Sequence, residues 1–157
     1  MILLTNRCRL ITPQKDTIAD IARLFTNATV RRYLGGPLSV RGAHDRVSAL
    51  LSEMITCWAI RTDADDAFIG FVSLGQHHDG VEIELSYLLL PTYWGQGYAT
   101  EAVEAVLHYG HNVMGLPRIV AETQSANLAS CRLLERVGMQ FVRSVKRFNA
   151  EQSIYST

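Results

Sequence analysis

The chain has 157 residues, 48% of them hydrophobic and 19% charged, a composition that excludes a disordered or fibrous protein. Fifteen Lys and Arg residues balance fifteen Asp and Glu residues, so no net charge draws the chain to nucleic acid or to an acidic membrane. The three cysteines form no C-x-x-C pair, the N-terminal apolar stretch is too short for a secretory signal, and no apolar run reaches the roughly 18 residues of a membrane span. We therefore expect one domain over residues 1–157, located in the cytoplasm.

The first half of the chain is predicted to contain two helices and several strands. Apolar residues at helical spacing predict the helices, β-rich runs predict the strands, and Gly35-Gly36-Pro37 marks a turn. In chain order we expect a strand over 7–11, helices over 18–25 and 43–54, and a hairpin of strands over 57–61 and 68–74 around the acidic turn 63–66.

A third strand of this series is expected over 81–90. Its alternation places Glu82, Glu84 and Ser86 on one face. The opposite face then carries Val81, Ile83, Leu85 and Tyr87. Two carboxylates on one strand face are either a solvated face or groups with a chemical role.

The second half is predicted to run helix, strand, helix, strand. Its clearest amphipathic helix begins near Ala99 and ends at Gly115 and Pro117. The elements expected after it are a strand over 118–123, a helix with Ser125 as N-cap and Gly138 just past its end, and a strand over 141–148.

The stretch 91–102 joins a strand directly to a helix start and carries two glycines. Gly95 and Gly97 let the backbone turn tightly, and the unpaired amides and positive dipole end of the helix point into the same space. This arrangement predicts a phosphate or pyrophosphate site, with a ligand-free connection as the alternative. A P-loop is disfavoured because no Lys and Ser or Thr follow the second glycine, and a dinucleotide fingerprint is disfavoured because Thr100 stands at its last position.

Residues 93–102 resemble the acetyl-CoA pyrophosphate loop of the GNAT N-acetyltransferases, most closely in the RimJ/RimL-like branch that acetylates ribosomal-protein N-termini. Further stretches that resemble the family follow in order along the chain: 6–10, 30–36, 68–71, 84–87, 127–130 and 135–139. The resemblance implies an α+β fold with a mixed, splayed, mostly antiparallel sheet flanked by helices. It also implies that acetyl-CoA lies between the strand ending near Leu90 and the strand beginning near Arg118.

The matched positions imply a site for acetyl-CoA as co-substrate, without a metal. Backbone groups of Leu88, Leu89 and Leu90 are implied to pair with the pantetheine arm, often beside a β-bulge, and Asn127 to contact the same arm. The loop residues implied to hold the pyrophosphate are Gly95, Gln96, Gly97, Tyr98, Ala99 and Thr100. Because Gln96 replaces a frequent basic residue, the charge must be met by amides, the helix dipole or an arginine elsewhere.

Amine acetylation needs a base for the acceptor and an acid for the departing thiolate. The resemblance implies Glu84 as the base, with Glu82 as the second candidate, and Ser130 as the proton donor. Leu134 occupies the position at which other family members carry a tyrosine. The alternatives are a solvated face for the two glutamates and a capping or packing role for the serine.

We therefore expect acetyl transfer to a primary amine, either a protein N-terminus or a small molecule, by direct attack in a ternary complex. The competing classes are a non-catalytic CoA-binding module and a nucleotide-binding regulator. Acceptor choice is expected to depend on the loops 33–38, 63–66 and 76–80. His77 and His78 form a poor metal site, because neighbours on a strand point to opposite faces. No nucleic-acid or membrane partner is expected, and a homodimer is allowed.

Overall fold

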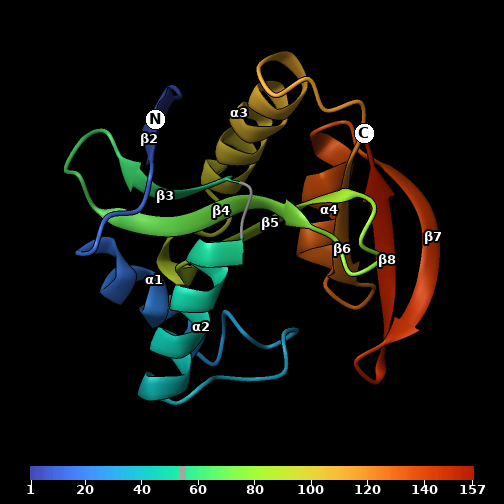
Figure 1. The fold of residues 1–157 in the computed structure, drawn as a ribbon, viewed down its shortest axis with the longest axis horizontal. Coiled ribbons are helices and arrows are strands. Elements are labelled where there is room, and N and C mark those ends of the chain that lie inside the picture. The colour runs from blue at the N-terminus through green and yellow to red at the C-terminus, as the bar shows by residue number, and fades with distance from the viewer. Residues whose placement is uncertain (54–55) are drawn as a thin grey trace.

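The computed structural model describes residues 1–53 and 56–157, and one eight-stranded sheet runs through it (Figure 1). The strand order is β1-β2-β3-β4-β5-β6-β8-β7, and of the described strand pairs only β5–β6 is parallel. The expected mixed, mostly antiparallel α+β fold is therefore confirmed. The helices and strands are β1 (Ile2–Leu4), β2 (Cys8–Ile11), α1 (Thr17–Thr26), α2 (Val40–Glu53), β3 (Thr56–Thr62), β4 (Phe68–Gln76), β5 (Ile83–Leu89), η1 (Pro91–Tyr93), α3 (Tyr98–Asn112), β6 (Ile119–Gln124), α4 (Leu128–Arg136), β7 (Gln140–Arg147) and β8 (Ala150–Ser156).

The parallel strands β5 and β6 are joined over a short stretch. Their register pairs Ile83 with Ile119 and Glu84 with Val120. Beyond these pairs β5 continues to Leu89 along its antiparallel partner β4, without a bulge, whereas the described residues of β6 pair with β8 instead. One edge of β5 is therefore left open, and this is the splay that the family resemblance implies.

Helices cover both faces of the sheet and form two apolar clusters. Leu85 and Leu89 of β5 point to the cluster built by α3 and α4. Leu88 belongs to β5 as well but points to the opposite cluster, built by α1 and α2, which Leu90 also contacts. Figure 1 shows α1 and α2 below the central strands β3 and β4, and α3 above them. The far end of β5 thus has apolar neighbours on both faces.

Most predicted elements are present, with ends that differ by a few residues. The second helix begins at Val40, and its expected end at Met54 lies outside the described residues. Two strands are not predicted from the sequence: β1, because three residues with exposed Ile2 and Leu4 carry too little pattern, and β8, because its last five residues are all buried and do not alternate. Within the described residues no helix is both long and apolar enough to span a bilayer.

Two local predictions are wrong. Ser125 is not the N-cap of α4, because the helix begins later and is capped by Asn127, whose Oδ1 accepts the Ser130 N–H at 3.3 Å. Val81 does not belong to the apolar face of β5, since it is 82% exposed and lies in the turn before the strand. The alternation that places Glu84 and Leu85 on different faces of the sheet is nevertheless present from the first residue of β5.

Candidate active site

The segment between β5 and α3 contains two glycines in the left-handed region. Gly95 has φ 70° and Gly97, the N-cap of α3, has φ 85°. The Glu101 N–H donates the first main-chain hydrogen bond of the helix, to the Gly97 carbonyl at 3.1 Å, and among the described residues no side chain caps this end. The amides that precede Glu101 therefore form an open helix start, which is the geometry that an anion site requires.

Arg7, which immediately precedes β2, braces this loop. Its Nη1 donates to the Gln96 carbonyl at 3.0 Å and its Nε to Glu101 Oε2 at 2.9 Å. Glu101 Oε1 also accepts the Arg7 main-chain N–H at 2.7 Å and the Thr5 hydroxyl. The turn between β1 and β2 is thereby tied to the first turn of α3.

Two arginines from distant parts of the chain lie beside the open helix start. The Arg7 guanidinium stands 4.3 Å from the centre of the Tyr98 ring and is 46% exposed, and a Cβ atom on Gly97 would lie 3.2 Å from its Nη2. Arg136 of α4 reaches Thr100 Oγ1 at 3.5 Å. Arg7, which is also paired with Glu101, and Arg136 therefore place guanidinium groups beside a loop whose own residues 91–102 contain no Lys or Arg.

The open edge of β5 presents main-chain groups of alternate residues. The Leu90 N–H donates to Ile69 at 2.9 Å, so the even-numbered residues face β4. The main-chain groups of Leu85, Tyr87 and Leu89 accordingly face the gap toward β6. The Leu89 carbonyl already accepts the indole N–H of Trp94 at 2.8 Å. Of the three strand-end leucines expected to meet pantetheine, Leu89 is the one whose backbone faces the gap.

A tyrosine and a serine meet on the α4 side of this gap. The Tyr87 hydroxyl lies 2.7 Å from Ser130 Oγ, and burial raises the Tyr87 pKa to about 12. Leu134 is buried in the core, so the phenol near the serine comes from β5 instead of from α4. Sequence reasoning missed Tyr87 because its contact with Ser130 joins residues 43 positions apart.

Glu84 lies at the point where β5 and β6 separate, since its pair with Val120 is the last one between them. Its side chain is on the face opposite to Tyr87, as the alternation predicts. Burial is the main cause that raises the Glu84 pKa from its ordinary 4.5 to about 7; the nearby Glu122 raises it further, and His77 and Arg147 lower it. A carboxyl group with this pKa changes its charge near neutral pH.

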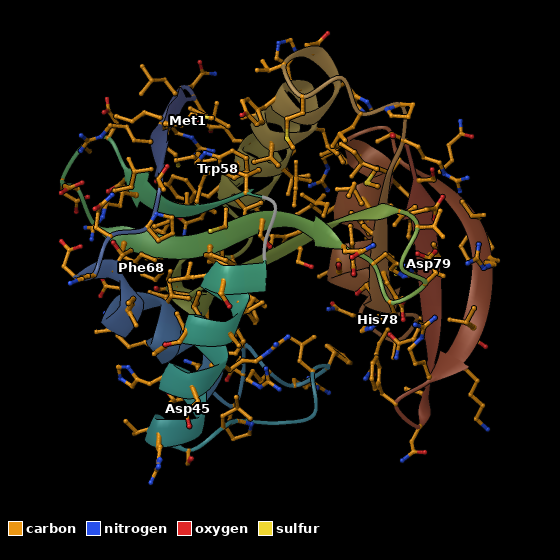
Figure 2. All side chains as sticks on the ribbon, in the orientation of Figure 1. Met1, Asp45, Trp58, Phe68, His78 and Asp79 are labelled. Atoms are coloured by element: carbon orange, nitrogen blue, oxygen red, sulfur yellow. The ribbon has the colours of Figure 1, made fainter. Side chains whose placement is uncertain are left out.

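Charged groups from neighbouring segments surround Glu84 on the same face. The ion pairs are His77 with Glu122 (2.8 Å) and Asp79 (3.0 Å), Arg147 with Glu122 (3.3 Å), and Arg118 with Glu82 (3.1 Å). Within the described residues Glu84 has no ion-pair partner, and no group of three or more His, Cys, Asp or Glu side chains is arranged to hold a metal ion. Figure 2 shows His78 and Asp79 on the turn after β4.

The acidic turn 63–66 is largely neutralised within the chain. Asp63 and Asp66 pair with Arg9 at 3.4 and 2.9 Å, and Asp66 also lies 3.8 Å from Arg61. Asp65 accepts the Thr62 hydroxyl, and this hydrogen bond lowers the Asp65 pKa. This turn is therefore less suited to attract a cationic acceptor than its sequence suggests.

The open edge of β5 and the open start of α3 together form a site suited to an extended ligand that carries a pyrophosphate, such as acetyl-CoA. The model of the acetyltransferase (GNAT) domain matches residues 7–140. The chain belongs to the GNAT acetyltransferase family, and the expected family is confirmed.

Known proteins agree with this assignment. The chain is 34% identical to the uncharacterized N-acetyltransferase YoaA of Bacillus subtilis, over 88% of this chain and 82% of that protein. Its fold is similar to that of a GNAT acetyltransferase from Bacillus anthracis, with a TM-score of 0.87 and 20% identity over 100% and 98% of the two chains. The ribosomal-protein acetyltransferase RimL, solved in complex with coenzyme A, has a TM-score of 0.83 and 14% identity over 100% and 97%.

Proposed function

We propose that residues 1–157 form a single domain that transfers the acetyl group of acetyl-CoA directly to a primary amine, with Glu84 as general base and Ser130 as proton donor. The observation that carries the proposal is the position of Glu84 at the fork of β5 and β6, combined with a pKa of about 7. A base with this pKa is well suited to accept a proton from an ammonium group near neutral pH.

Acetyl-CoA is proposed to bind across the fork. The amides from Gln96 to Thr100 would hold the pyrophosphate, with Arg7 and Arg136 nearby. The pantetheine arm would pair with the free edge of β5 and meet Asn127, which caps α4 beside the gap. The thioester then lies between Glu84 on one face and Ser130 on the other.

The chemistry balances with these two groups. The acceptor ammonium gives one proton to Glu84, and the resulting amine attacks the thioester carbonyl carbon. A carbon–nitrogen bond forms and the carbon–sulfur bond breaks, with the oxyanion stabilised by main-chain amides of the fork. The thiolate takes a proton from Ser130 Oγ. The attacking nitrogen then gives its second proton to Ser130 Oγ, which restores the hydroxyl and leaves a neutral amide. Glu84 returns its proton to water.

An acceptor screen with acetyl-CoA tests the proposed function. We expect thiol release with at least one class of amine, among protein N-terminal peptides, polyamines and aminoglycosides. Binding of coenzyme A without thiol release across the whole panel would favour a non-catalytic CoA-binding module. Competition of ATP or NAD with coenzyme A would instead favour a nucleotide-binding regulator.

Arg7→Ala is expected to raise the KM for acetyl-CoA on the order of 10-fold, with a smaller change in kcat. The variant loses both the cation beside the loop and the hydrogen bond to the Gln96 carbonyl. Arg9→Ala is the matched control, because Arg9 is close in sequence but pairs with Asp63 and Asp66. Equal KM values in the two variants would contradict a role of Arg7 at the loop.

Ser130→Ala is expected to lower kcat by about 10- to 100-fold and to leave the KM for acetyl-CoA nearly unchanged. Tyr87→Phe should have a smaller effect in the same direction, because it removes the hydroxyl that lies 2.7 Å from Ser130 Oγ and keeps the ring. Steady-state thiol release measures both variants. A full rate in Ser130→Ala would assign the serine to helix packing alone.

A further inference from the structure

His77 lies on the same face of the sheet as the proposed base. Its main-chain N–H donates to the Glu82 carbonyl at 2.9 Å, so the β4–β5 ladder continues past the last residue of β4. Gly75 is opposite Glu84 in this ladder, and alternation places His77 on the same side as Gly75. The His77 side chain is 0% exposed, whereas His78, the next residue, is exposed.

Both ring nitrogens of His77 meet carboxylates. Nε2 lies 2.8 Å from Glu122 Oε2 and Nδ1 lies 3.0 Å from Asp79 Oδ2. The Asp79 N–H also lies 3.4 Å from Nδ1, and we assign the shorter contact as the hydrogen bond of the ring. Two carboxylate partners require two ring N–H donors, which only the imidazolium form has. Burial lowers the His77 pKa, but the hydrogen bonds to Glu122 and Asp79 outweigh it and the net change is upward.

The other charges around Glu84 are already paired. Glu122, whose side chain is 5% exposed, is shared between His77 and Arg147, and Glu82 is held by Arg118. His77, the main chain of Glu122 and Arg147 each favour the ionised form of Glu84 and lower its pKa. The hydrogen bond from His77, directly after β4, to Glu122 of β6 also connects the two strands that flank β5.

We infer that His77 is a positioning residue for acetyl transfer. It is held as an imidazolium between Asp79 and Glu122, and its positive charge keeps Glu84 ionised between turnovers. The inference rests on the proposed role of Glu84 as the base. No proton passes through the imidazole, because both of its nitrogens are occupied by carboxylates. The charge acts on Glu84 through space, by favouring return of the proton to water.

His77→Gln tests this role, because the amide can still donate to Glu122 but carries no charge. The pH at which kcat/KM reaches half of its maximum is expected to rise by about 0.5 units or more, with the KM for acetyl-CoA changed less than about twofold. His108→Gln, which changes an exposed histidine of α3 whose side chain bonds only Asn112 within the described residues, is the matched control and is expected to leave the midpoint unchanged. If His77→Gln does not fold, Asp79→Asn removes one of the two carboxylates that stabilise the imidazolium, and we expect a smaller shift in the same direction.

A second measurement does not depend on turnover. In protein labelled with 13C at the glutamate carboxyl carbons, the Glu84 signal is assigned by its loss in Glu84→Gln, and its titration midpoint should be higher in His77→Gln than in the wild type. Equal midpoints would overturn the inference and leave the base intact. Full activity of Glu84→Gln would instead overturn the proposed base, whatever the midpoints are.

Discussion

Replacement of Glu84 by glutamine is expected to lower kcat/KM for the amine by about 10²- to 10⁴-fold and to leave the affinity for acetyl-CoA nearly unchanged. In the wild type kcat/KM should rise as the pH increases through about 7, because Glu84 must be ionised to accept a proton. The profile is measured with an acceptor whose own pKa lies above the pH range. The rise near pH 7 should be absent in the variant.

Glu82→Gln is the matched control for this variant. Glu82 is on the same face but is held by Arg118 at 3.1 Å, so its loss should change kcat/KM only slightly. If Glu82→Gln loses as much activity as Glu84→Gln, the result contradicts Glu84 as the specific base. Either Glu82 takes that role, or both substitutions disturb the region where β5 and β6 separate.

Folding stability separates a chemical effect from a structural one. The Glu84 pKa is about 7 in the folded protein, above its ordinary 4.5, so the contribution of this group to stability is fully present below pH 4.5 and is lost as the pH rises through 7. The difference corresponds to at most about 3 kcal/mol. Glu84→Gln should therefore unfold at a higher temperature than the wild type at pH 8, although it is inactive.

Gly97→Ala is expected to weaken acetyl-CoA binding by about 10-fold or more. At φ 85° an alanine costs about 1 to 2 kcal/mol, and its Cβ would lie 3.2 Å from Arg7 Nη2, so both the helix start and the guanidinium must shift. Calorimetric titration with coenzyme A measures the affinity directly.

Gly115→Ala separates loop geometry from general strain. Gly115 has φ 68° with nothing within 4 Å of an added Cβ, and it lies beyond the opposite end of α3. Both alanine variants should be destabilised to a similar extent, but only Gly97→Ala should lose affinity for coenzyme A. Unchanged affinity in Gly97→Ala would remove the helix start from the binding site.

Features that depend on neighbouring residues could be predicted from the sequence. The alternation of β5 places Glu84 and Tyr87 on opposite faces, and two glycines before an amphipathic pattern predict the open helix start. The family resemblance added the splay of the sheet, which no local pattern contains. The facing of Glu84 and Tyr87 and the open helix start could be predicted because main-chain periodicity or a single turn determines each of them.

Contacts across the fold could not be predicted in this way. Arg7 and Glu101 are 94 positions apart, and His77 and Glu122 are 45 positions apart. Each contact depends on the strand order and on which side-chain rotamers the neighbours allow, and a single sequence does not specify these. The sequence alone therefore predicts for His77 only a place in the acceptor loop 76–80 and a poor metal site, whereas its two carboxylate partners make it part of the charge arrangement around Glu84.

The order of the last strands has a consequence for how the protein is made. β8 follows β7 in the chain but lies between β6 and β7 in the sheet. During synthesis β7 therefore has no neighbour in the sheet until residues 150–156 have left the ribosome, and Arg147 cannot settle beside Glu122 before then. The half of the molecule that carries the loop 95–100 does not depend on this pairing, whereas the side of the sheet next to the proposed base requires residues 150–156.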